Sequence, residues 1–141
     1  MRILGLVLRK GNLFYAVLEG ETRHRARIVK VNRAAAKRTT TPSILMDWYD
    51  HAFRDLIDHY RPDIVVHETA DELSAQEAPF EIFPLGVLNL MCHRRQVMCK
   101  SRAGDYITSV RKRRCKEYFY DMELQLFDPE LDAVILAWHE M

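Results

Sequence analysis

The chain has 141 residues, a length typical of a single domain that buries a sizeable core. Its 21 Lys and Arg, 20 Asp and Glu and 48% hydrophobic residues are ordinary for a soluble globular protein with a net charge of +1. No apolar stretch reaches the 18 residues that indicate a membrane span, so we expect one domain over residues 1–141 and no membrane association.

The cysteines and the N-terminus indicate an intracellular protein. Cys92, Cys99 and Cys115 form no Cys-x-x-Cys pair and no Cys/His spacing typical of a zinc site. The N-terminal apolar run is too short for a secretory signal peptide. We therefore expect reduced thiols and a cytoplasmic location. The sequence carries no signal for the oligomeric state.

Charges of like sign are segregated along the chain. Residues 22–46 contain seven Lys or Arg and no acid, and residues 100–116 contain seven more against one Asp. Acidic residues gather at 47–63, 68–81 and 117–130. Such segregation indicates either an anionic partner such as nucleic acid or simply solvated faces of the molecule.

The chain begins with a predicted β-hairpin. Two apolar runs, Ile3–Leu8 and Leu13–Leu18, flank a polar four-residue turn. A third strand over Arg23–Asn32 completes an antiparallel meander. Arg23, Arg25 and Arg27 recur at every second position, which would place them on one face of that strand as a candidate nucleic-acid contact.

Helical and extended patterns alternate in the remainder. Thr41 followed by Pro42 is typical of a helix start, and this helix is expected to end near Tyr60. The later expected elements are a buried strand over Asp63–Glu68, a helix over Phe80–Arg94, a strand over Gln96–Cys99, a basic helix from Ser101 to about Tyr120, and a helix over Glu130–His139. The order βββαβαβα plus a C-terminal helix predicts an α/β fold, with a five-stranded mixed sheet flanked by helices.

Three segments resemble those of a known superfamily. Ile3-Leu4-Gly5-Leu6 is similar to the first strand of RNase H-like proteins, in particular the RuvC/YqgF Holliday-junction-resolvase branch. Asp63–Glu68 resembles the fourth strand, which in RuvC-type enzymes ends in a catalytic Glu. Leu131–Ala137 is similar to the last helix, which begins with an Asp. The resemblance spans nearly the whole chain and implies an RNase H-like fold.

The resemblance also implies where catalytic acids would lie. In this superfamily, carboxylates from the first strand, the fourth strand and the last helix hold two Mg²⁺ or Mn²⁺ ions about 4 Å apart. Glu68 and Asp132 fall at two of these positions, and Asp128 lies one helical turn before Asp132. Structural alternatives are a solvated Glu68, an Asp132 that favours the helix N-terminus, and an Asp128 that caps the helix.

Val7 falls where the superfamily has its first catalytic Asp, and a valine cannot bind a cation. A replacement ligand could come from Glu19, Asp105 or His67, and the sequence selects none of them. His67 alternates with Glu68 along the strand, so it should face the other side as a core or interface histidine. We expect no cofactor, with Mg or Mn only if the protein is an active nuclease.

A basic helix offers a candidate nucleic-acid contact. Its cations lie close to aromatic residues in the sequence, an arrangement that suits phosphate binding and base stacking. The alternative is a surface helix whose aromatic residues pack inward. The cations are Arg111, Lys112, Arg113, Arg114 and Lys116.

Three functions follow from these patterns. The missing acid and the basic segments favour a degenerate RNase H-like domain that binds DNA, RNA or a protein without cutting. Glu68 and Asp132 favour an active metal-dependent nuclease with a rearranged carboxylate site. The near-zero net charge permits a protein-interaction subunit with no nucleic-acid role.

Overall fold

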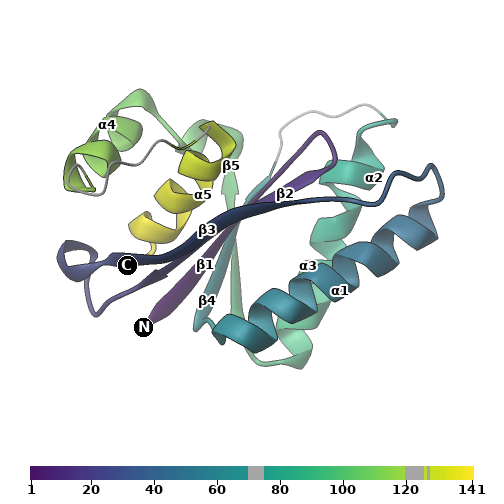
Figure 1. The fold of residues 1–141 in the computed structure, drawn as a ribbon, viewed down its shortest axis with the longest axis horizontal. Helices are drawn as coiled ribbons and strands as arrows, with labels where there is room; N and C mark the ends of the chain where they lie inside the picture. The colour runs from purple at the N-terminus through teal and green to yellow at the C-terminus, as the bar shows by residue number, and fades with distance from the viewer. Residues whose placement is uncertain (70–74, 120–125, 127) are drawn as a thin grey trace.

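A mixed five-stranded sheet forms the centre of the computed structural model, which describes residues 1–69, 75–119, 126 and 128–141 (Figure 1). The strands lie in the order β3-β2-β1-β4-β5, with β1, β2 and β3 antiparallel and β4 and β5 parallel to β1. This confirms the predicted α/β class and the pairing of the first strand with the fourth. The bounds are β1 (Arg2–Arg9), β2 (Asn12–Glu19), β3 (Arg27–Ala35), β4 (Ile64–Thr69) and β5 (Met98–Ala103).

Helices cover both faces of the sheet. In Figure 1, α1 and α3 lie on one side and α5 on the other, and α4 packs against α5. No helix in the described part of the chain is long and apolar enough to cross a membrane. The bounds are α1 (Pro42–Tyr60), α2 (Ala78–Glu81), α3 (Phe83–Arg94), α4 (Ser109–Tyr118) and α5 (Asp128–His139), with short 3₁₀ turns η1 (Arg23–Arg25) and η2 (Gly104–Tyr106).

Each face of the sheet has its own apolar core. Successive side chains of a strand point to opposite faces, so Val7 and Val66 join the core beneath α5, whereas Leu6 and Val65 join the core beneath α1 and α3. The central strands β1 and β4 are covered on both sides. That burial explains why both read as nearly continuous apolar runs in the sequence.

The hairpin between β1 and β2 is tighter than predicted. Its ladder pairs Arg9 with Asn12, which leaves Lys10 and Gly11 as a two-residue turn. Both turn residues have positive φ, 48° at Lys10 and 77° at Gly11. This is the backbone of a type I′ turn, which favours glycine.

Several predicted boundaries are wrong. β3 begins at Arg27, because the residues before it form η1. The predicted helix over residues 80–94 is two helices, α2 and α3. Pro84 lies in the first turn of α3, where its missing N–H costs nothing and favours a new helix start.

The last strand and the basic helix also differ from the prediction. β5 runs from Met98 to Ala103, because this segment pairs along the full length of β4. The basic helix therefore begins later, at Ser109. Its N-cap is Thr108, whose side-chain oxygen accepts a hydrogen bond from the Arg111 N–H, rather than Ser101. Residues 120–125, which include the predicted end of this helix, lie outside the described part of the chain.

Gly5 sets the distance between β1 and α5. A Cβ built on Gly5 would lie 2.1 Å from the carbonyl oxygen of Ala133. Only a residue without a side chain lets the helix approach the strand this closely. The contact anchors the helix beside Asp132, over the face of the sheet that carries Val7.

Candidate functional site

Val7, Glu68 and Asp132 gather on the α5 side of the sheet. Val7 is fully buried in the core beneath α5. The parallel register pairs Leu6 with His67, so Val7 and Glu68 are the next positions on the neighbouring strands β1 and β4. Glu68 follows Val66 by two residues and therefore points to the same face. Asp132 is in the first turns of α5, which lies over this face.

Glu68 is held by a cation from the neighbouring strand. Nη2 of Arg9, two residues after Val7 on β1, lies 2.5 Å from Oε2 of Glu68. The Glu68 side chain is only 7% exposed, so the carboxylate is not solvated, as the structural alternative supposed. A charge-assisted hydrogen bond of this kind is stronger than one between neutral groups.

Asp132 is also largely buried, at 14% side-chain exposure, and Nζ of Lys112 lies 3.7 Å from its Oδ1. No hydrogen bond from the described residues reaches that oxygen. Burial raises the pKa of Asp132, and the Asp128 carboxylate acts in the same direction. The cations of Lys112 and Arg9 oppose this shift in the pKa of Asp132. Arg9 therefore acts on both carboxylates.

Neither Glu19 nor His67 replaces the missing acid. Glu19 pairs with Arg2 at the opposite end of β1 and forms ion pairs with Arg2 and Arg27. His67 is 4% exposed and, two residues after Val65 on the same strand, faces the α1–α3 side, as predicted. Asp105, the third sequence candidate, is exposed in η2.

Comparisons with known proteins give structural matches only. No family model matches the chain, and no curated protein does. Thermus thermophilus RuvC superposes with a TM-score of 0.75 at 14% identity, over 98% of this chain and 92% of RuvC. RuvC from the same organism in complex with a Holliday junction substrate gives 0.75 at 11% identity, over 98% and 90% of the two chains. The fold is RuvC-like.

Two further resolvases share this RuvC-like fold. The yeast mitochondrial Holliday junction resolvase Ydc2 has a TM-score of 0.71 at 12% identity, over 96% of this chain and 75% of Ydc2. The fowlpox virus Holliday junction resolvase has a TM-score of 0.66 at 14% identity, over 100% and 97% of the two chains. The likeness thus extends over the whole chain, and it confirms the expected RNase H-like fold.

The described residues do not fit the two-metal centre that a RuvC-like nuclease would need. A hard divalent cation requires several free carboxylate oxygens. Position 7 supplies none, Glu68 binds Arg9, and Asp132 lies beside Lys112. Within residues 1–69, 75–119, 126 and 128–141, no three His, Cys, Asp or Glu side chains gather in a way that could hold a metal ion.

Arg23, Arg25 and Arg27 do not line one face of a strand, so this prediction is wrong. Nη2 of Arg23 donates to the carbonyl of His139 at 2.9 Å, and its guanidinium stacks on Trp138. Carbonyls at a helix C-terminus lack intrahelical donors, and Arg23 supplies one to α5. Arg25 pairs with Glu21 and Arg27 with Glu19.

In the basic helix α4, two cations bind other parts of the fold and the remaining cations are exposed. Arg111 donates to the carbonyl of Tyr106 at 2.6 Å and stacks on its ring, and Lys112 pairs with Asp132. Phe119 lies in the core beneath α5 and Tyr106 and Tyr118 pack against that core, as in the structural alternative. Three cations of α4 are exposed: Arg113, Arg114 and Lys116.

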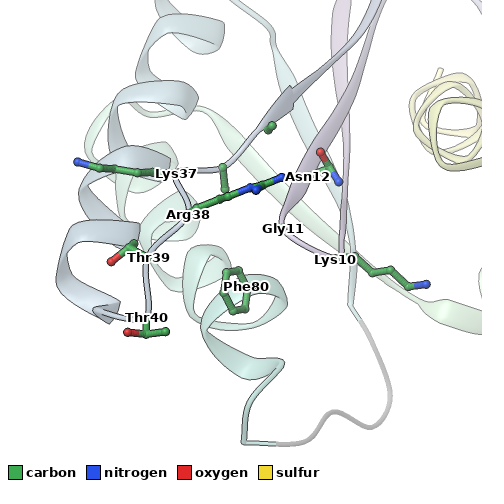
Figure 2. Close-up of a pocket in the computed structure, with 10 residues that line it drawn as sticks. Lys10, Gly11, Asn12, Lys37, Arg38, Thr39, Thr40 and Phe80 are labelled. Carbon is green, nitrogen blue, oxygen red and sulfur yellow. The ribbon is translucent and has the colours of Figure 1, made fainter.

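A basic cavity that sequence reasoning missed lies at the hairpin turn (Figure 2). It has a volume of about 530 Å³ and is lined by Lys10, Lys37, Arg38 and Phe80, among others. Its one sequence signal was the acid-free segment that contains Lys37 and Arg38. The hairpin turn and α2 complete it from distant parts of the chain.

Proposed function

We propose that this chain is a RuvC-like domain that binds nucleic acid without cutting it. One observation carries the non-catalytic part. The Arg9 guanidinium lies 2.5 Å from the carboxylate of Glu68, where a nuclease of this fold would use the acid for metal. A fixed cation thus takes up the negative charge that a divalent ion would need.

Catalysis by two metals would require this arrangement to be undone. Glu68 would have to release Arg9, whose guanidinium is the cation bound to this largely buried carboxylate. Val7 offers no oxygen in return. Two carboxylates alone supply too little negative charge to hold two divalent ions against their mutual repulsion.

The nucleic-acid part of the proposal is supported by surface charge and by analogy of fold. Thermus thermophilus RuvC, with the same fold, has been solved in complex with a Holliday junction substrate. In this chain, Arg114 and Lys116 on α4, and Lys10, Lys37 and Arg38 at the cavity, form no ion pair within the described residues. Such cations bind phosphates largely by releasing counterions.

The test combines cleavage and binding on the same substrates. Purified wild type and a Glu68→Gln control are incubated with Mn²⁺ or Mg²⁺ and with branched, single-stranded and duplex DNA and RNA. Binding is measured in parallel by fluorescence anisotropy with EDTA present. We expect salt-dependent binding by both proteins and cleavage by neither.

Asp132 favours a second candidate, the active nuclease with rearranged carboxylates. Its buried Oδ1 accepts no hydrogen bond from described residues, and the Lys112 ammonium 3.7 Å away offsets the cost of burial only in part. Metal-dependent cleavage by wild type that disappears in Glu68→Gln would establish this candidate in place of our proposal.

The apolar surface of α3 favours the third candidate, a protein-interaction subunit. Phe83 and Leu90 are each 49% exposed and lie seven residues apart, two helical turns along the same helix. Exposed apolar residues in register often mark a protein contact. Absence of DNA and RNA binding at about 50 mM salt, where counterion release favours binding, would leave this candidate.

A further inference from the structure

The basic cavity is formed by three segments that are distant in the sequence. Figure 2 shows the β1–β2 turn on one side, the connection between β3 and α1 on the other, and Phe80 of α2 between them. Its volume, about 530 Å³, lies in the range of small-molecule sites and well above the size of a simple inorganic anion.

The walls of the cavity are held in place by the fold. The Ala36 N–H donates to the Gly11 carbonyl at 2.8 Å, which ties the connection to the turn. The hydroxyl of Tyr49, a fully buried residue, donates to the carbonyl of Phe80 at 3.2 Å. A Cβ on Gly11 would lie 3.7 Å from Cδ1 of Phe80, so the ring rests against the turn. The cavity is preorganised.

The cations that line the cavity bear on the kind of ligand it favours. Lys10, Lys37 and Arg38 form no ion pair within the described part of the chain. Elsewhere, cations such as Arg2 and Arg95 have carboxylate partners. Figure 2 shows Arg38 directed across the cavity toward Asn12, and Lys37 and Lys10 directed away from it. A rigid hollow with unpaired cations favours an anionic ligand.

Phe80 narrows the class of anion. Its ring is half-buried and borders both this cavity and a second hollow of about 450 Å³, which Arg9 and Lys10 line together with Gln76, Glu77 and Glu81. An aromatic wall beside cations suits a ligand with a planar ring as well as a phosphate. Bases stack on aromatic side chains whatever their sequence, and arginine matches phosphate oxygens with two parallel N–H groups.

We infer that this cavity binds a nucleoside phosphate, with the base against Phe80 and the phosphate on Arg38. Asn12 offers an amide donor and an acceptor to the ligand. The ligand is either a free nucleotide or one unpaired nucleotide of a bound strand. In the second case the inference rests on the proposed function.

The test uses defined probes and matched variants of the full chain. The probes are AMP, UMP and inorganic phosphate by titration calorimetry, and a fluorescein-labelled 12-nucleotide single strand and its blunt duplex by anisotropy. The cavity variants are Phe80→Leu and Arg38→Gln. Phe80→Tyr keeps the ring, Arg38→Lys keeps the charge, and Arg94→Gln removes an exposed cation from the end of α3 instead. Circular dichroism melts confirm that each variant is folded.

We expect a nucleotide or the single strand to bind more tightly than inorganic phosphate or the duplex. Loss of one base–aromatic stack should weaken binding by roughly 5- to 100-fold in Phe80→Leu. Phe80→Tyr should bind like wild type, and Arg38→Lys should retain more affinity than Arg38→Gln. Binding of free AMP or UMP identifies a free nucleotide as the ligand, and binding of the single strand alone identifies an unpaired nucleotide.

Different failures have different meanings. Equal single-strand binding by wild type, Phe80→Leu and Arg38→Gln would overturn the inference and leave the proposed function standing. Binding of AMP that both cavity variants lose, without binding of either oligonucleotide, would support the inference and overturn the proposed function. Equal affinity for AMP and inorganic phosphate, unchanged in Phe80→Leu, would overturn the assignment of a nucleoside. Binding of no probe would overturn both.

Discussion

At position 7, a carboxylate would replace a valine that α5 covers completely. We expect Val7→Asp to lower the free energy of unfolding by at least about 3 kcal/mol in metal-free buffer, because a buried charge without a full set of partners is costly. With Glu68 and Asp132 on the same face, the new carboxylate should also create affinity for Mn²⁺ or Mg²⁺. Thermal melting with and without Mn²⁺ measures both effects.

The control for this experiment is Val7→Asn, which has nearly the shape of Asp and no charge. Its melting temperature should not respond to metal. Metal that binds the native state raises stability, so a rise confined to Val7→Asp would show that the three positions retain metal-site geometry. Equal responses of the two variants would contradict this interpretation of the site.

Asp132 is a second position where ionisation opposes folding. Its pKa is raised in the folded protein, so the native state binds protons more readily than the unfolded chain, and ionised Asp132 lowers stability at neutral pH. Asp132→Asn should therefore raise the melting temperature at pH 7. The gain should shrink as the pH falls through the pKa of Asp132, because wild-type Asp132 is then protonated as well.

Melting curves of wild type and Asp132→Asn between pH 7 and pH 4 test whether ionised Asp132 lowers the stability of the fold. A variant less stable than wild type at pH 7 would mean that the interaction with Lys112 outweighs the cost of burial. A stabilising substitution at a candidate site is the usual sign that the natural residue was retained for another reason than stability.

Individual elements differ in how well the sequence predicts them. β1, β2 and β4 are apolar runs whose burial is evident from their own residues, and their predicted bounds agree with the structure to within one or two positions. The prediction for β5 ends too early because its later residues, Lys100 to Arg102, are polar. They are extended because their backbone completes the ladder with β4, and no local pattern records such a partner.

Some features of the candidate site could likewise be predicted from the sequence, and others could not. The gathering of Glu68 and Asp132 on one face follows from the resemblance and from strand alternation. The sequence pattern places Arg9 in a turn, because nothing near it indicates a partner 59 residues away. The arginines at 23, 25 and 27 have the period of a strand, yet Arg23 caps a helix that ends 116 residues later. The basic cavity depends on three segments, residues 10–12, residues 35–40 and Phe80, that only the fold brings together.

The packing of α5 on β1 can be tested by a pair of glycine substitutions. In Gly5→Ala the new methyl group meets the Ala133 carbonyl 2.1 Å away, so α5 must move and the core beneath it must loosen. We expect a loss of about 2–4 kcal/mol by urea unfolding, as for other overpacked cores.

Gly86→Ala is the matched control, since nothing lies within 4 Å of a Cβ at Gly86 in helix α3. There, alanine should be neutral or should add up to about 1 kcal/mol through helix propensity. Similar losses in the two variants would contradict the close approach of α5 to β1.

For the whole molecule, the distribution of exposed cations matters more than the net charge of +1. Nucleic-acid affinity should fall steeply with salt concentration, by counterion release. Replacing Arg113, Arg114 and Lys116 together with Gln should reduce the slope of log affinity against log salt, by up to about 0.9 for each phosphate that the variant no longer neutralises.

The control for the salt experiment is Arg61→Gln with Arg94→Gln, which removes exposed cations from the ends of α1 and α3. Anisotropy titrations between roughly 50 and 200 mM salt give both slopes. An unchanged slope in the α4 variant, beside a reduced slope in the control, would place the nucleic acid on the opposite side of the sheet.

The Arg9–Glu68 pair has a consequence for how this protein depends on its surroundings. A metal ion dissociates when its free concentration falls, whereas a guanidinium joined to the chain by covalent bonds stays at its carboxylate at any dilution. The charge of the Glu68 carboxylate is therefore neutralised by a residue of the same chain as soon as the chain folds. A chelator cannot disrupt this ion pair, because the pair contains no metal. The ion pair therefore contributes equally to the fold in metal-starved and metal-rich cells.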